Sequence, residues 1–130
     1  MNLSYFVTCD AAAMTKENKM VLHGIFDTIF AGQEPSPEAP VGHPSMAVAF
    51  EVVGLPAGKA VTAVLELTHE AGGDPIFRNE GMLVGDGELG KHTAIFSLNL
   101  MRFPRSGKYQ IALAIDGKVL GTRSLLLKVR

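Results

Sequence analysis

The sequence predicts an all-β protein, a two-sheet antiparallel β-sandwich of about eight strands with an Ig-like or jelly-roll-like arrangement. Three observations lead to this fold class. Apolar side chains alternate with other residues at period two over most of the chain, and no sustained period of 3.6 residues is found. Segments rich in Gly, Pro and Asp, which are turn-forming residues, separate the alternating runs at the spacing of a sandwich or barrel.

Each predicted strand presents one apolar face, and we expect these faces to form the core. The members of the faces, in chain order, are Leu3, Tyr5, Val7 and Cys9; Met46, Val48, Phe50 and Val52; Val61, Ala63, Leu65 and Leu67; Ala94, Phe96, Leu98 and Leu100; Tyr109, Ile111, Leu113 and Ile115; and Leu125, Leu127 and Val129. Segments 19–27 and 75–84 complete the strand count. The sequence therefore supplies apolar faces for two layers.

Two connections have specific predictions. The dipeptide Asp116-Gly117 lies between two strand-like runs and is typical of a two-residue type I′ hairpin, in which both residues take positive φ. Residues 32–44, "GQEPSPEAPVGHP", contain four prolines and show no periodicity. We expect this segment to be a loop that joins the two sheets, because proline cannot donate to a ladder of hydrogen bonds.

Length and charge restrict the classes of function. A chain of 130 residues has the size of one domain, and we expect a single domain over residues 1–130. Twelve Lys and Arg balance thirteen Asp and Glu without a basic stripe, so we expect no nucleic-acid partner. No apolar run approaches the roughly 18 residues needed to cross a bilayer, so no membrane partner is expected either. Cys9 is the single cysteine, and the start of the chain lacks an export signal, which favours the cytoplasm.

No catalytic motif is recognisable, so we expect no catalytic residues, no cofactor and no metal ligands. The four histidines lie about twenty or more residues apart, without the short spacings of a metal site on one element. The acidic residues near Gly read as turn formers. If distant residues do converge, the functional candidates are Asp10, His23, Asp27 and His43.

Asp27 lies among four large apolar side chains in "HGIFDTIF", residues 23–30. The apolar positions fit neither strict alternation nor one strand face, so the strand is expected to bulge or bend here, with Gly24 before it. At such a bend, a partly buried carboxylate accepts bonds from a displaced backbone or from a neighbouring hydroxyl. We interpret Asp27 as a structural bracket rather than a catalytic or ligand-binding acid.

The faces opposite the core also carry apolar residues: Ala47, Ala49, Val53, Ile95, Ala112, Ala114 and Leu126. Small apolar side chains are common on protein surfaces, which is one explanation. The other explanation is that one sheet packs against a second copy of the chain, as in a homo-oligomer.

Several motifs occur along the chain: the opening "YFVTCD", then "GIFDTIF", then Pro104, Gly107 and Tyr109 followed by Asp116-Gly117. In these motifs the chain resembles a family of small bacterial proteins of unknown function. The resemblance spans nearly the whole chain, and residues 55–92 are the least distinctive part. The resemblance implies a bacterial cytoplasmic β-sandwich, and it implies no catalytic residues because the family has no assigned activity.

Three hypotheses of function follow. The first is a non-catalytic module that binds another protein or a small-molecule ligand, because the distinctive residues shape turns and cores. The second is an enzyme or metal-binding protein whose site assembles from separated loops. The third is a structural subunit that works by self-association.

Overall fold

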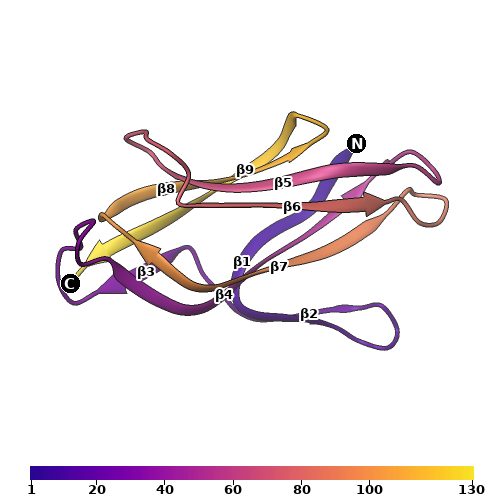
Figure 1. Cartoon of the computed structure of the whole chain (residues 1–130). Coiled ribbons are helices and arrows are strands. Elements are labelled where there is room, and N and C mark those ends of the chain that lie inside the picture. The colour runs from indigo at the N-terminus through magenta and orange to yellow at the C-terminus, as the bar shows by residue number, and fades with distance from the viewer.

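The computed structural model describes all 130 residues and is built from strands. It contains no helix with the length and apolar character that crossing a bilayer requires. The nine strands (Figure 1) are β1 (Asn2–Met14), β2 (Met20–Ile25), β3 (Thr28–Ala31), β4 (Val41–Val53), β5 (Ala60–His69), β6 (Phe77–Val84), β7 (His92–Phe103), β8 (Gly107–Ile115) and β9 (Lys118–Val129).

The strands form two sheets, which confirms the predicted sandwich. One sheet has the order β2-β1-β4-β7 and the other the order β3-β9-β8-β5-β6. The β1-β4-β7 and β9-β8-β5-β6 orders correspond to strands A-B-E and G-F-C-C′ of an immunoglobulin sandwich, so the arrangement is the Ig-like one. Two details differ from the expectation: there are nine strands instead of about eight, and the short β3 pairs with β9 in parallel.

The core lies between the sheets and contains most of the predicted residues. Phe50, Val52, Leu65, Leu67, Leu98, Ile111 and Leu113 are buried in one cluster, and Phe96 packs against it. Tyr5 and Val7 were expected in the core, but they lie on the opposite face of β1. Leu3 packs against the core as predicted, but an irregularity between Leu3 and Tyr5 shifts the register with β4, so Phe6 packs against the core in their place.

Leu100 is a second correction, because the alternation of β7 predicted it in the core and it is 75% exposed. Leu98 points into the core, and the next core residues are Met101 and Phe103, so the alternation changes phase between them. Leu100 makes this change with a φ of 56°, a left-handed conformation that costs a bulky residue free energy.

The Pro-rich segment joins the two sheets as expected, since it runs from β3 in one sheet to β4 in the other. It is shorter than predicted, because β4 begins at Val41 and includes Pro44. The pairing of β4 with β1 ends at Ala47, so Pro44 has no β1 neighbour that needs its missing N–H.

Two turns hold the second sheet in shape. Asp116 and Gly117 have φ values of 48° and 83°, which confirms the predicted hairpin, and the Asp116 carboxylate accepts a bond from the Thr62 N–H at 2.9 Å. Tyr109 is fully buried and donates its hydroxyl to the Arg105 carbonyl at 2.6 Å. This bond, four residues back across a corner, is the tyrosine corner of Ig-like sandwiches.

Leu100→Gly is expected to raise the free energy of unfolding by about 0.5–1 kcal/mol, because glycine adopts positive φ without strain and little buried surface is lost. Leu89→Gly is the matched control, since Leu89 is 69% exposed and is not among the residues with positive φ. Urea unfolding measures both, and the control should lose stability. A loss in Leu100→Gly equal to that of the control would contradict the strain.

Candidate functional site

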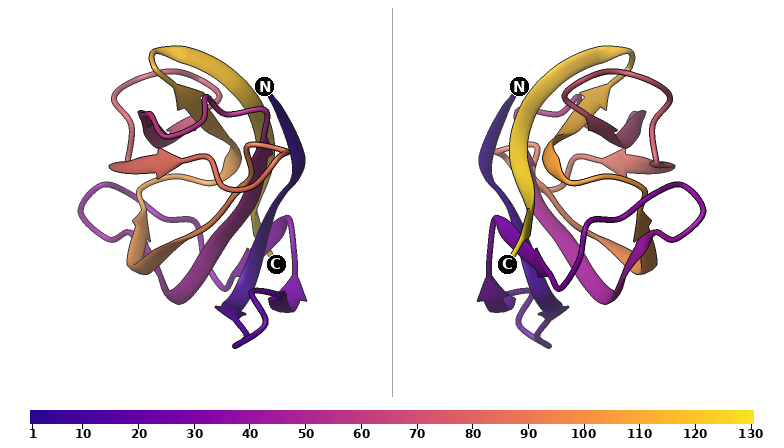
Figure 2. Two further views of the ribbon diagram at one scale, coloured as in Figure 1. Left: turned by 90° about the vertical axis from the view of Figure 1, so that its right-hand side faces the viewer. Right: turned by 90° about the vertical axis from the view of Figure 1, so that its left-hand side faces the viewer.

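The β1–β2 hairpin is the largest departure from a plain Ig-like sandwich. The pairing of β1 with β4 ends at Cys9, and from Cys9 to Met14 β1 pairs with β2 instead. The hairpin bends away from the remaining strands of its own sheet and projects beneath β4 and β7 in Figure 1. The end-on views of Figure 2 show it outside the body of the sandwich.

The bend of the hairpin occurs where Asp10 faces Gly24. Gly24 has a φ of 63°, and a Cβ atom added to it would overlap the Asp10 carboxylate. Position 24 therefore requires glycine for two reasons: the backbone is left-handed, and there is no space for a side chain. The sequence pointed to a bend near Gly24, but it gave no sign that Asp10 lies against it.

The chain changes sheets immediately after β2, at Phe26 and Asp27. Thr8, which is fully buried, donates its hydroxyl to the Phe26 carbonyl, and the Phe26 N–H donates back to the Thr8 carbonyl. One residue further, the Asp27 carbonyl accepts the Leu126 N–H at 2.8 Å. The segment is thus bonded to β1 in one sheet and to β9 in the other.

The bend is held by the Thr8 hydroxyl and by main-chain bonds rather than by the Asp27 carboxylate. Asp27 is exposed, so the expectation of a partly buried carboxylate is wrong, and its one bond is from the neighbouring Thr28 hydroxyl at 3.0 Å. The sequence missed Thr8, which holds the bend, because a threonine at period two in a strand looks like an ordinary surface residue.

The outer edge of β2 is free and apolar. Along an antiparallel strand, residues whose N–H and C=O bond to the neighbouring strand alternate with residues whose N–H and C=O point away from it. The bond from the Thr15 N–H to the Lys19 carbonyl sets the phase of this alternation, so the N–H and C=O of Met20 and Leu22 point away from β1. Residues 20–25, "MVLHGI", contain no Asp, Glu, Lys or Arg. Val21 is 39% exposed and Ile25 is 57% exposed.

The other three sheet edges carry features that discourage pairing with another chain. β3 has four residues, and the Arg130 guanidinium covers its Phe30 ring at 4.3 Å. β6 carries Arg78, which pairs with Glu66 and Glu80. The regular course of β7 is interrupted by Leu100 in its left-handed conformation. β2 has neither a charge, nor a proline, nor a cover.

A polar groove of about 340 Å³ lies between the hairpin and the end of the sandwich. Its lining residues are Met14 and Asn18 from the hairpin and Val84, Asp86, Gly87, Lys91, His92 and Thr93 from the β6–β7 region. Both Lys91 and Thr93 bind the Glu51 carboxylate at 3.2 Å, and the Glu51 side chain is 16% exposed. Of the two charged lining residues, Lys91 is therefore paired, whereas Asp86 forms no ion pair.

Tyr5 lies next to Glu51 in the pairing of β1 with β4. Its hydroxyl is buried without a hydrogen-bond partner. Burial raises the pKa of Tyr5, and the Glu51 carboxylate raises it further. The phenol therefore stays protonated to higher pH than that of an exposed tyrosine.

Cys9 is fully buried, as expected, but it lies on the outer face of β1 and outside the core cluster. Its Sγ donates to the Ala47 carbonyl at 3.8 Å. Burial raises the pKa of the Cys9 thiol, and the Asp10 carboxylate adds to this effect. A buried thiol with a raised pKa is a poor nucleophile.

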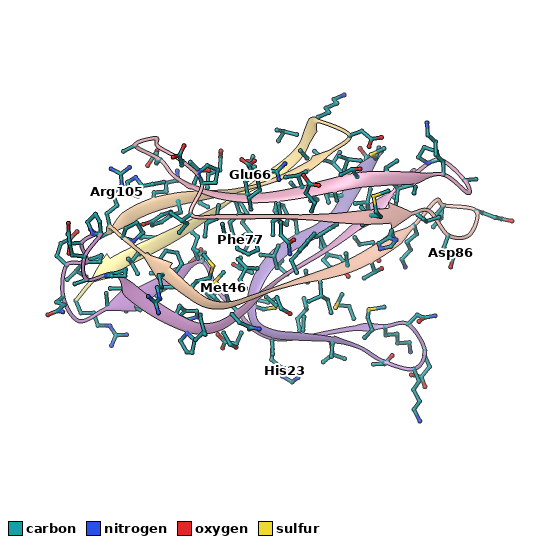
Figure 3. The ribbon with its side chains drawn as sticks, viewed as in Figure 1. His23, Met46, Glu66, Phe77, Asp86 and Arg105 are labelled. Carbon is teal, nitrogen blue, oxygen red and sulfur yellow. The ribbon has the colours of Figure 1, made fainter.

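Of the four candidate residues, three belong to the hairpin and its base. Asp10 and His23 lie on its two strands and Asp27 follows it, and Figure 3 shows His23 pointing away from the sandwich. His43 is half-buried in β4 with its ring 5.8 Å from the Phe26 ring. No group of three or more His, Cys, Asp or Glu side chains is close enough to hold a metal ion.

Thr8→Val is expected to lower the free energy of unfolding by about 1–2 kcal/mol, because it leaves the Phe26 carbonyl without its partner at nearly constant volume. Thr28→Val removes the hydroxyl that donates to the exposed Asp27 carboxylate and is the matched control. Thr28→Val and Asp27→Ala should each lower the free energy of unfolding by at most about 0.5 kcal/mol. Thermal melts compare the variants. Equal losses for Thr8→Val and Thr28→Val would contradict the role given to Thr8.

The structure is similar to that of Pseudomonas fluorescens alkylpurine DNA glycosylase AlkC bound to DNA containing an abasic site analog, with a TM-score of 0.51 and 11% sequence identity. The match covers 95% of this chain and 30% of the glycosylase, so this chain spans less than a third of that protein, and the likeness is one of fold. No curated protein matches the sequence. The sequence model of a family of unknown function (DUF6941) matches residues 4–128, and the chain therefore belongs to that family.

Proposed function

We propose that the protein is a non-catalytic interaction module that binds an extended strand of a protein partner along the free edge of β2. The observation that carries the proposal is the contrast between the four edges, since β2 alone has neither a charged residue nor a charged side chain covering it. A strand that pairs with β2 gains main-chain hydrogen bonds from Met20 and Leu22, which is the mode called β-augmentation.

The groove beside the hairpin gives such a partner a route to side-chain recognition. Met14 lines it at the end of β1 and Asn18 at the tip of the hairpin, so a strand on β2 lies near its opening. Lys91 is already paired with Glu51, and Asp86 has no ion-pair partner, which favours a partner segment with a hydrogen-bond donor or a positive charge at this point.

DNA binding, which the similar glycosylase structure displays, is not part of the proposal. A formal charge of −1 and the absence of a basic stripe give this chain little with which to neutralise phosphates. The likeness to that structure concerns the fold alone and carries no function to this chain.

A photo-crosslinking amino acid in place of Val21, introduced in the native host cell, tests the proposal. Illumination should attach a defined polypeptide, and the product should disappear when Leu22→Pro is added, because proline removes an N–H that the partner needs. The same crosslinker in place of Leu89, an exposed residue of the β6–β7 loop, should attach nothing reproducible. Equal products from the two positions, or none from Val21, would refute the proposal.

A further inference from the structure

We infer that the strand bound by β2 is β2 of a second copy of this chain, in an antiparallel two-fold pair that joins two four-stranded sheets into one. The inference rests on the proposed function and names the partner of the same edge. Three features of the hairpin lead to it: the chemistry of the edge, the charges at its two ends, and its position outside the sandwich.

The edge is chemically suited to pair with itself. In a two-fold symmetric contact, β2 of one copy lies against β2 of the other, so a charged strand would be repelled by the same charge on the second copy. Residues 20–25 carry no formal charge, and this repulsion does not arise. We place the two-fold axis at Leu22, so that Leu22 of one copy lies opposite Leu22 of the other and the two residues exchange two main-chain hydrogen bonds. In the same register, Val21 lies opposite His23 of the second copy.

The charges that flank β2 favour the antiparallel direction. The tip of the hairpin carries Lys16, Glu17 and Lys19, and its base carries Asp10 and Asp27. None of these side chains forms an ion pair within the chain. Antiparallel pairing brings the basic tip of each copy toward the acidic base of the other, whereas parallel pairing would bring tip to tip.

The position of the hairpin leaves room for a second copy. β2 is the last strand of its sheet, and the hairpin lies outside the body of the sandwich (Figures 1 and 2). Pairing of two strands of six residues gives an interface below the roughly 1,200 Å² of standard stable complexes. The dimer is therefore weak, and it forms as the concentration rises through the micromolar range.

Sedimentation equilibrium of the full chain, from about 1 µM to about 1 mM, tests the inference. The mass should rise with concentration from 13.9 kDa toward twice that value. Val21→Lys and Leu22→Pro should hold it at the monomer value, because one adds like charges and the other removes an N–H. Leu89→Lys, the matched control at an exposed apolar residue of the β6–β7 loop, should dimerise like the unchanged chain.

Variants of the hairpin tip keep the test decisive if either β2 variant fails to fold. Lys16 and Lys19 lie at or next to an exposed turn, so Lys16→Glu combined with Lys19→Glu leaves the strands intact. This double variant should raise the dimer Kd about tenfold at low ionic strength, and the difference should shrink in high salt. An unchanged Kd would contradict the arrangement.

The outcomes separate this inference from the proposed function. A chain that stays at the monomer mass at every concentration overturns the inference, as does a folded Leu22→Pro variant that dimerises normally. If the crosslinker at Val21 then attaches a different protein in an edge-dependent way, the module binds a foreign strand and the proposed function stands alone. A crosslink to the same chain together with the mass increase supports both.

Discussion

The peptide segment at Phe26 and Asp27 is the constraint on which the remaining structure depends. It is bonded to Thr8 in one sheet and to Leu126 in the other, so one short stretch of backbone belongs to both layers. The chain changes sheets here, so β2 ends in the first sheet and β3 begins beside β9 in the second. Loss of the bond to the Phe26 carbonyl would lower the free energy of unfolding, because Thr8 is buried and water cannot take the place of its hydroxyl.

Two residues with left-handed backbone redirect strands, and they differ in cost. Gly24 turns the hairpin out of the first sheet without a steric penalty, and the Asp10 carboxylate occupies the space that a side chain would take. Leu100 changes the phase of β7 so that Met101 and Phe103 enter the core, and here a bulky residue adopts the strained conformation. The gain is the burial of two large side chains, each worth about 1.5–3 kcal/mol, against a local cost of about 1–2 kcal/mol. The strain at Leu100 thus has a structural cause within the fold.

The proposed interaction surface at the edge of β2 depends on the features of the four sheet edges. An Ig-like sandwich has exposed strand edges by construction, and each must be short, charged, bent or covered if the protein is to remain a monomer. Three edges of this protein carry a charged residue or a charged cover, whereas β2 has neither, and its bend at Gly24 leaves residues 20–23 regularly paired. The hairpin also places Asp10, His23 and Asp27, three residues that the sequence marked as candidates, around one edge rather than in one cavity. Their arrangement favours a role in the docking of a strand, in which the charges set direction and the main chain supplies the bonds.

The sequence alone determined the properties that depend on neighbouring residues. Period-two alternation predicted the strands and most of the core, and Asp116-Gly117 predicted its hairpin, because strand faces and tight turns are local consequences of backbone geometry. Tertiary structure alone decided where the alternation shifts. The irregularity after Leu3 and the turn at Leu100 moved Tyr5, Val7 and Leu100 out of the core, and no local signal marks a change that is driven by distant partners. The free edge of β2 was equally invisible, because whether a strand is an edge depends on which strands lie beside it, and that is fixed by the packing of the whole chain.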